Sequence, residues 1–138
     1  MLTASEIMSE GVVVIYEDML ISQVAHLMLR DRVSSFPVVS KGMGIVGIIT
    51  MTDLFMMISK AFYYEKVESF DRQIGRFKEM TVEKVMTRSV ITISPQTTLD
   101  EIVNLVVKKG VHAFPVVEQD KLIGIVGRHD ILNAIFSY

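Results

Sequence analysis

A hydroxyl and a carboxylate stand three positions apart in Thr50-Met51-Thr52-Asp53, directly after an apolar run that ends at Ile49. If a strand turns into a helix here, the Thr50 hydroxyl and the first free amides of the helix lie at the positive end of the helix dipole, where they can meet a phosphate. Asp53, one turn further on, can accept two hydrogen bonds from a ribose diol. The same pattern is also typical of a capped helix start, with Thr50 as the cap and an acid in the first turn.

Two other places carry similar chemistry. Gly127-Arg128-His129-Asp130 keeps the carboxylate but has no hydroxyl at its first position. Arg128 can contact a phosphate instead, or serve as an ordinary surface charge. Because Gly127 lacks a side chain, we expect Asp130 to matter less as a helix cap, which mildly favours a ligand role. His112 can add a donor or partial positive charge near neutral pH, although a structural histidine is the plainer interpretation.

These places correspond because the chain contains one unit written twice. The stretches 33–39 and 47–54 return as 111–117 and 124–131. Phe36 and Phe114 are 78 positions apart, as are Met8 and Met86. A duplicated unit of this kind predicts a pseudo-twofold arrangement with a shared groove.

Composition excludes several classes of function. The 138 residues are 50% hydrophobic, yet no apolar run is long enough to span a membrane. A net charge of −2 gives no reason to expect nucleic acid, and the absence of cysteine excludes thiol catalysis and thiolate metal sites. The sequence has no nucleophile beside a His-acid pair, no Gly-rich phosphate loop followed by Lys, and no set of His and acidic residues at the spacing of metal ligands. We therefore expect no enzyme activity, no catalytic residues and no metal-ligating residues. The ten methionines fit core filling or, less strongly, adaptable packing against a neighbour. We expect a cytoplasmic protein that contacts neither nucleic acid nor membrane.

The residue pattern of each copy predicts the order strand, helix, strand, strand, helix. The β-branched runs 12–15 and 90–93 predict the first strands, and apolar residues at helical spacing follow each run. Hairpins are predicted for 36–39 with 45–49 and for 114–117 with 122–126. Capping-box patterns start a short helical turn at Thr3 and the second long helix at Thr98, and residues 81–84 stand where the short turn of the second copy is expected. Gly110 suits the left-handed end of the second long helix.

The region between the copies is not a flexible linker. Residues 59–79 contain one glycine, no proline, and aromatic residues among alternating charges. We interpret it as an extension of the preceding helix followed by a helical crossover. Its role is left open between a partner or dimer surface and a connector that covers the sheet edge. The predicted domains are therefore 1–58, 59–79 and 80–138.

With the elements in this order, the chain resembles a tandem pair of cystathionine-β-synthase (CBS) domains, the arrangement called a Bateman module. The resemblance rests on Phe-Pro-Val-Val at 36–39 and 114–117, on Gly-x-x-Thr-x-x-Asp at Gly47, Thr50 and Asp53, and on the dipeptides Met8-Ser9 and Met86-Thr87. It implies an α/β (α+β) fold, two βαββα repeats packed about a pseudo-twofold axis. It also implies two clefts that in many relatives bind an adenosine-containing ligand, without catalysis.

In that family each cleft combines the Thr-x-x-Asp of one copy with the first strand and Pro-Val loop of the other. The first predicted cleft consists of Thr50, Asp53, Val90, Ile91, Thr92, His112, Ala113 and Pro115. The second, weaker because its signature has lost the threonine, consists of Val12, Val13, Ser34, Ser35, Pro37, Arg128, His129 and Asp130.

The resemblance implies a regulatory module that requires no cofactor and passes its bound state to an unidentified protein partner. AMP, ADP or ATP are the first expected ligands; S-adenosylmethionine, NAD and cyclic di-AMP share the adenosine part. With adenine nucleotides as the ligands, we expect the module to take part in energy sensing. Modules of this family commonly associate through their helical faces, so we expect a homodimer. The alternative is a ligand-free scaffold for dimerisation or docking.

Overall fold

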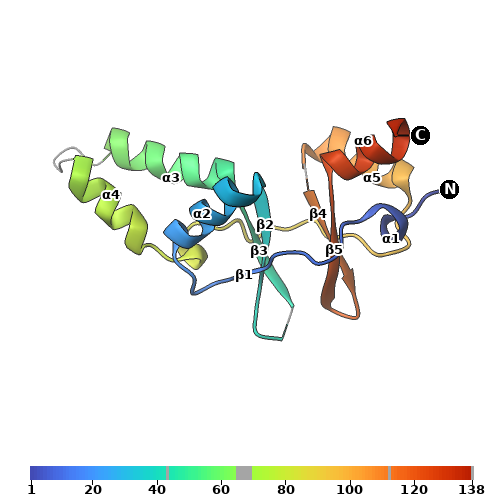
Figure 1. Ribbon diagram of the computed structural model, residues 1–138, viewed down its shortest axis with the longest axis horizontal. Helices are drawn as coiled ribbons and strands as arrows, with labels where there is room; N and C mark the ends of the chain where they lie inside the picture. Colours follow the sequence, from blue (N-terminus) through green and yellow to red (C-terminus); the bar gives the residue numbers. More distant parts are fainter. Residues whose placement is uncertain (43, 65–69, 112, 138) are drawn as a thin grey trace. The chain divides into compact units, whose positions relative to one another are not determined.

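The computed structural model describes residues 1–42, 44–64, 70–111 and 113–137. It confirms a mixed α/β chain. In order, the elements are α1 (Ala4–Ile7), β1 (Ile15–Tyr16), α2 (Ile21–Asp31), β2 (Ser35–Val39), β3 (Ile45–Thr50), α3 (Met51–Tyr64), α4 (Phe70–Glu79), the 3₁₀ turn η1 (Val82–Lys84), α5 (Leu99–Lys109), β4 (Ala113–Glu118), β5 (Lys121–Gly127) and α6 (Arg128–Phe136) (Figure 1).

The chain forms two compact units, and each takes segments from both sequence repeats. Unit 1 contains Met1–Val13, Gly42–Ile45 and Val90–Tyr138, and unit 2 contains Val14–Lys41 and Val46–Ser89. The start of the chain thus packs with the second repeat, and residues 80–89 pack with the first. The domain boundaries predicted along the sequence divide the chain by repeat and stay a prediction.

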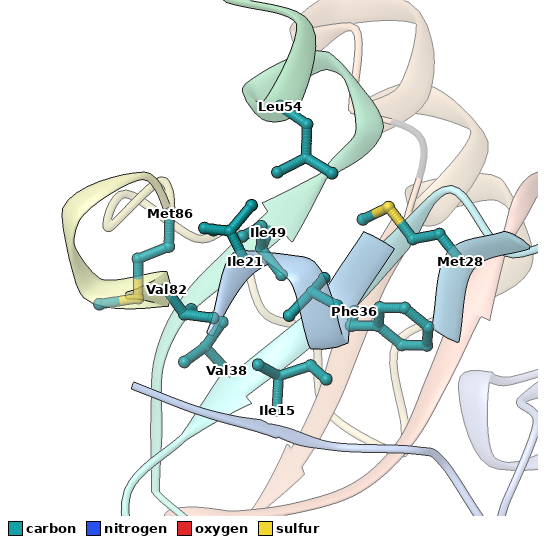
Figure 2. Packing of buried hydrophobic residues seen from close by; sticks show 10 residues of the cluster. Ile15, Ile21, Met28, Phe36, Val38, Ile49, Leu54, Val82 and Met86 are labelled. Carbon is teal, nitrogen blue, oxygen red and sulfur yellow. The ribbon is translucent and has the colours of Figure 1, made fainter. Parts of the chain in front are cut away.

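Unit 2 is built on a three-stranded sheet in the order β1-β2-β3. β1 runs parallel to β2, with Ile15 opposite Val38 and Tyr16 opposite Val39. Figure 2 shows side chains from the sheet, from α2, from α3 and from residues 82–86 converging on one apolar core. Its buried members are Ile15, Ile21, Val24, Met28, Phe36, Val38, Ile49, Leu54, Val82 and Met86.

The helical prediction for 59–79 is confirmed over its described part. α3 continues from the end of β3, and α4 folds back beside it (Figure 1). The Gln73 side-chain amide donates a hydrogen bond to the Ala61 carbonyl at 3.3 Å, and the rings of Phe62 and Phe77 meet edge to face with centroids 6.3 Å apart. α4 also contacts α2. These contacts hold the two helices together on one side of unit 2.

Unit 1 is built on the antiparallel hairpin β4–β5, with Ala113 opposite Gly127. Gln119 and Asp120 both adopt positive φ, 50° and 63°, which gives the turn the twist that a two-residue hairpin favours. The buried core side chains of this unit are Ala4, Ile93, Ile102, Phe114, Val116, Val126 and Ile131. α5 ends at Gly110 in the left-handed conformation, as predicted.

The predicted first strand of each copy is largely wrong. Strand pairing in the first copy begins only at Ile15, and the run 90–93 forms a single parallel bridge between Ile93 and Val116. The physical reason is that β-branched composition favours extended backbone but does not supply a partner for it. Val12, Val13, Val90, Ile91 and Thr92 therefore lie outside the regular strands.

Candidate functional site

The start of α3 is closed by reciprocal hydrogen bonds between Thr50 and Asp53. The Thr50 amide donates to Asp53 Oδ2 at 2.9 Å, and the Asp53 amide donates to Thr50 Oγ1 at 3.0 Å. The Met51 amide donates to the Ser34 carbonyl at 2.8 Å. The expectation of free amides beside Thr50 is therefore wrong for Met51 and Asp53, because each already has an acceptor within unit 2.

The second carboxylate oxygen of Asp53 is held by a residue distant in sequence. Thr87 Oγ1 donates to Asp53 Oδ1 at 3.0 Å. Thr87 also exchanges two backbone hydrogen bonds with Ile48, both of 2.8 Å, so the segment through Thr87 crosses β3 as a bridge. This crossing leaves no space for a side chain at Gly47: a Cβ there would lie 2.8 Å from the Thr87 carbonyl oxygen and 2.8 Å from Met86 Sδ. The glycine of the Gly-x-x-Thr-x-x-Asp signature thus leaves the space in which the Met86-Thr87 segment packs against β3.

Unit 1 repeats this arrangement. Ser9 Oγ donates to Asp130 Oδ1 at 2.9 Å, and the Gly127 amide donates to Asp130 Oδ2 at 2.7 Å. Ser9 exchanges backbone hydrogen bonds of 2.9 and 3.1 Å with Ile125, and a Cβ at Gly124 would meet the Met8 side chain and the Ser9 carbonyl. The expectation that Asp130 matters less as a cap is wrong, because it accepts the amide of Gly127 as closely as Asp53 accepts that of Thr50.

Ser9 and Thr87 are the site residues that sequence reasoning missed. They entered only as markers of the repeat, within the dipeptides Met8-Ser9 and Met86-Thr87. The available signal was a hydroxyl residue at matching positions, 78 apart, together with a carboxylate in the other stretch of each repeat. Their contacts show that the dipeptides and the Asp-containing signature form one hydrogen-bonded unit.

Capping leaves both carboxylates with spare acceptor capacity. An ionised carboxylate offers about four lone-pair directions on its two oxygens. Asp53 and Asp130 are each half-buried, and each of their carboxylate oxygens accepts a hydrogen bond from a neutral donor. Each can therefore accept further donors from a ligand without giving up its cap, so the helix-cap interpretation and the ligand interpretation are compatible.

The remaining predicted residues fall into both units. Within unit 2, Ser34 is exposed, Ser35 is half-buried and Pro37 is buried. Within unit 1, Pro115 is buried, its carbonyl accepts the Ile93 amide at 3.0 Å, and Ala113 lies at the start of β4. Arg128 and His129 are exposed in the first turn of α6. The prediction for His112 lies outside the described residues. Both predicted clefts draw on the two units and stay predictions.

In the described parts of the chain, no three His, Cys, Asp or Glu residues are grouped as a metal site. Among the described helices, none is both long and apolar enough to cross a bilayer.

A model of the CBS domain family matches the chain twice, over residues 4–60 and 82–137. The chain belongs to the CBS domain family and carries the domain as a tandem pair. The resemblance proposed from the sequence is confirmed.

Two curated relatives differ in how much of their length the chain spans. An uncharacterized protein of Methanocaldococcus jannaschii, MJ1426, is 31% identical over 89% of the chain and 85% of the relative. The homoserine O-acetyltransferase of Methanosalsum zhilinae is also 31% identical, over 99% of the chain but only 25% of the relative. The chain thus corresponds to a quarter of that enzyme and to most of MJ1426.

Solved structures share the fold. The chain superposes on MJ1225 of Methanocaldococcus jannaschii with a TM-score of 0.85 and 26% identity, covering 96% of this chain and 47% of the other. The complex of CBSX2 with AMP gives 0.80 at 22% identity, covering 98% and 96%. The CBS domain pair of MJ0100, in complex with 5′-methylthioadenosine and S-adenosyl-L-methionine, gives 0.76 at 24% identity, covering 97% and 95%. The expected arrangement of two βαββα repeats agrees with these neighbours.

Proposed function

We propose that this CBS pair is a non-catalytic regulatory module that binds an adenosine-containing ligand, with AMP, ADP or ATP the first candidates. The observation that carries the proposal is the carboxylate of Asp53, oriented through both oxygens at a helix start and still able to accept hydrogen bonds. A ribose presents two adjacent hydroxyl donors, which suit such an acceptor. The first cleft is proposed to hold the ligand.

The complexes of similar folds support the ligand class. The neighbour CBSX2 binds AMP, and the MJ0100 pair binds 5′-methylthioadenosine and S-adenosyl-L-methionine. All three molecules contain adenosine and differ in what is attached to its 5′ carbon. S-adenosylmethionine, NAD and cyclic di-AMP therefore belong in any test beside the adenine mononucleotides.

Calorimetry with this panel on the wild type and on Asp53→Ala tests the proposal. Loss of charge-assisted hydrogen bonds costs about 1.5–3 kcal/mol, which weakens binding roughly ten- to a hundredfold. A module that binds none of the panel, or binds equally well after the substitution, contradicts the proposal. Mass spectrometry of small molecules retained through purification would identify the physiological ligand.

We further propose that the bound state is passed to a protein partner. The fused arrangement in the Methanosalsum zhilinae enzyme supports this, since there the matched region is a quarter of a larger protein. A partner domain in the same polypeptide and a separate protein are both compatible with that relationship.

A second candidate function is a scaffold for self-association. It is favoured by large apolar side chains exposed on α3 and α6, among them Phe55, Leu132 and Phe136, which is 76% exposed. A stable dimer by light scattering, combined with no thermal shift from any nucleotide, would support this candidate over the first.

A further inference from the structure

Unit 2 contains a concave surface that shares Asp53 with the proposed nucleotide site but is otherwise lined by residues outside that site. It lies between α3, α4 and the segment around η1, and has a volume of about 700 Å³. This volume is within the range of small-molecule sites, roughly 300–1,000 Å³. We call it the methionine groove, after Met56, Met57 and Met80, which line it together with Phe77.

The floor of the groove is the outer surface of the apolar core. Met57 and Met80 pack against the buried cluster of unit 2 and are only partly covered. Met56 is 56% exposed, a large apolar area for a side chain with no packing role in the core. Methionine is unbranched and polarizable, so three of them form a lining that adapts to the shape of an apolar ligand.

Two uncompensated cations border this apolar floor. Lys60 of α3 and Lys84 of η1 both line the groove. Neither forms an ion pair within 4.0 Å with any part of the chain that the structure describes. Arg76 and Asp53 also line the groove. Lys60 and Lys84 therefore supply two positive charges beside an apolar surface.

We propose that the methionine groove binds a small organic anion with an apolar body, a carboxylate or sulfonate carrying an aromatic or aliphatic group. The apolar part would lie on Met56, Met57, Met80 and Phe77, with the acid group toward Lys60 and Lys84. A nucleotide fits the methionine part of this lining less well, because the methionines cannot satisfy the polar groups of its sugar and base edges. The groove is thus proposed as a second site adjoining Asp53, and the residues that line it belong to unit 2.

Methionine methyl NMR on the full chain tests this directly, with 1-anilinonaphthalene-8-sulfonate as the probe. The chain has ten methionines, so methyl labelling gives resonances both inside and outside the groove. We expect saturable shifts at Met56, Met57 and Met80, with Met28 in the core and Met8 in unit 1 unmoved. Shifts spread evenly over all methyls, or no saturable shift, would overturn the proposal.

Charge variants test the role of the lysines. Lys60→Gln with Lys84→Gln should weaken probe binding about three- to tenfold, because two partly solvated attractions are lost. Lys108→Gln with Lys109→Gln makes the same change in net charge on α5 of unit 1 and should leave binding unchanged. An equal loss in both double variants contradicts the site, provided that both melt like the wild type. If AMP moves these groove methyls and the sulfonate does not, the groove belongs to the nucleotide site and the proposal fails.

Discussion

Asp53 and Asp130 make the same two kinds of hydrogen bond in their separate units. Each carboxylate binds an amide at a helix start through one oxygen and a hydroxyl through the other. The hydroxyl belongs to Thr87 or Ser9, whose backbone bridges the strand that leads to that helix. One acidic side chain thus joins a strand crossing to a helix start, which orients its oxygens before any ligand arrives.

Removal of the Thr87 hydroxyl should remove its hydrogen bond to Asp53 without creating a cavity in the core. We expect Thr87→Val to lower the free energy of unfolding by about 0.5–1 kcal/mol, since an exposed hydrogen bond to a carboxylate is lost. It should also weaken nucleotide binding, because Asp53 Oδ1 is no longer held. Urea denaturation and calorimetry measure the two effects.

Thr87→Ser is the matched control, since it keeps the hydroxyl and removes only a methyl group. It should bind nucleotide like the wild type. If Thr87→Ser and Thr87→Val lose affinity equally, the hydroxyl does not position Asp53.

At the scale of elements, two glycines have opposite structural roles. Gly47 lies where the Met86-Thr87 backbone crosses β3, and a Cβ there has 2.8 Å contacts. Gly75 lies within α4, and a Cβ there meets no atom within 4 Å. The same substitution should therefore change stability in opposite directions at the two positions.

Gly47→Ala should destabilise the protein by about 1–3 kcal/mol, because the crossing backbone must move. Gly75→Ala should stabilise it by about 0.5–1 kcal/mol, through the higher helix propensity of alanine. Thermal and urea unfolding of both variants give the two signs. Destabilisation by Gly75→Ala would show that α4 is not packed as described, and a neutral Gly47→Ala would contradict the close crossing.

The sequence predicted elements better than it predicted their partners. The long helices, both hairpins and the left-handed end at Gly110 follow from local periodicity and turn chemistry, which act within a few residues. The strand at 12–15 failed because the run shows only a propensity, while pairing begins at Ile15. The hydroxyl donors Ser9 and Thr87 could not be assigned, because their acceptors lie 121 and 34 positions away.

At the scale of the molecule, both units interleave the two repeats. Residues 1–13 complete the unit that holds most of the second repeat, and residues 80–89 complete the unit that holds most of the first. Each unit needs a segment from the other repeat for its core, through Ala4 in unit 1 and Val82 in unit 2. We therefore expect neither repeat to fold well by itself.

The exposed apolar side chains of α3 and α6 lead to a prediction about assembly. We expect a homodimer at micromolar concentration, because association through these faces removes apolar surface from water. Phe55→Glu on α3 and Phe136→Glu on α6 should each shift sedimentation toward the monomer if the corresponding face is used. A wild type that sediments as a monomer at micromolar concentration would contradict the prediction.

The most direct test of the central claim compares Asp53→Ala with Asp130→Ala in calorimetric titrations with AMP. The two variants lose equivalent cap and hydroxyl contacts, so they control for each other structurally. If the first cleft binds the nucleotide, Asp53→Ala should lose about ten- to a hundredfold in affinity while Asp130→Ala stays near the wild type. Equal affinity in all three proteins, or a loss confined to Asp130→Ala, would contradict the assignment.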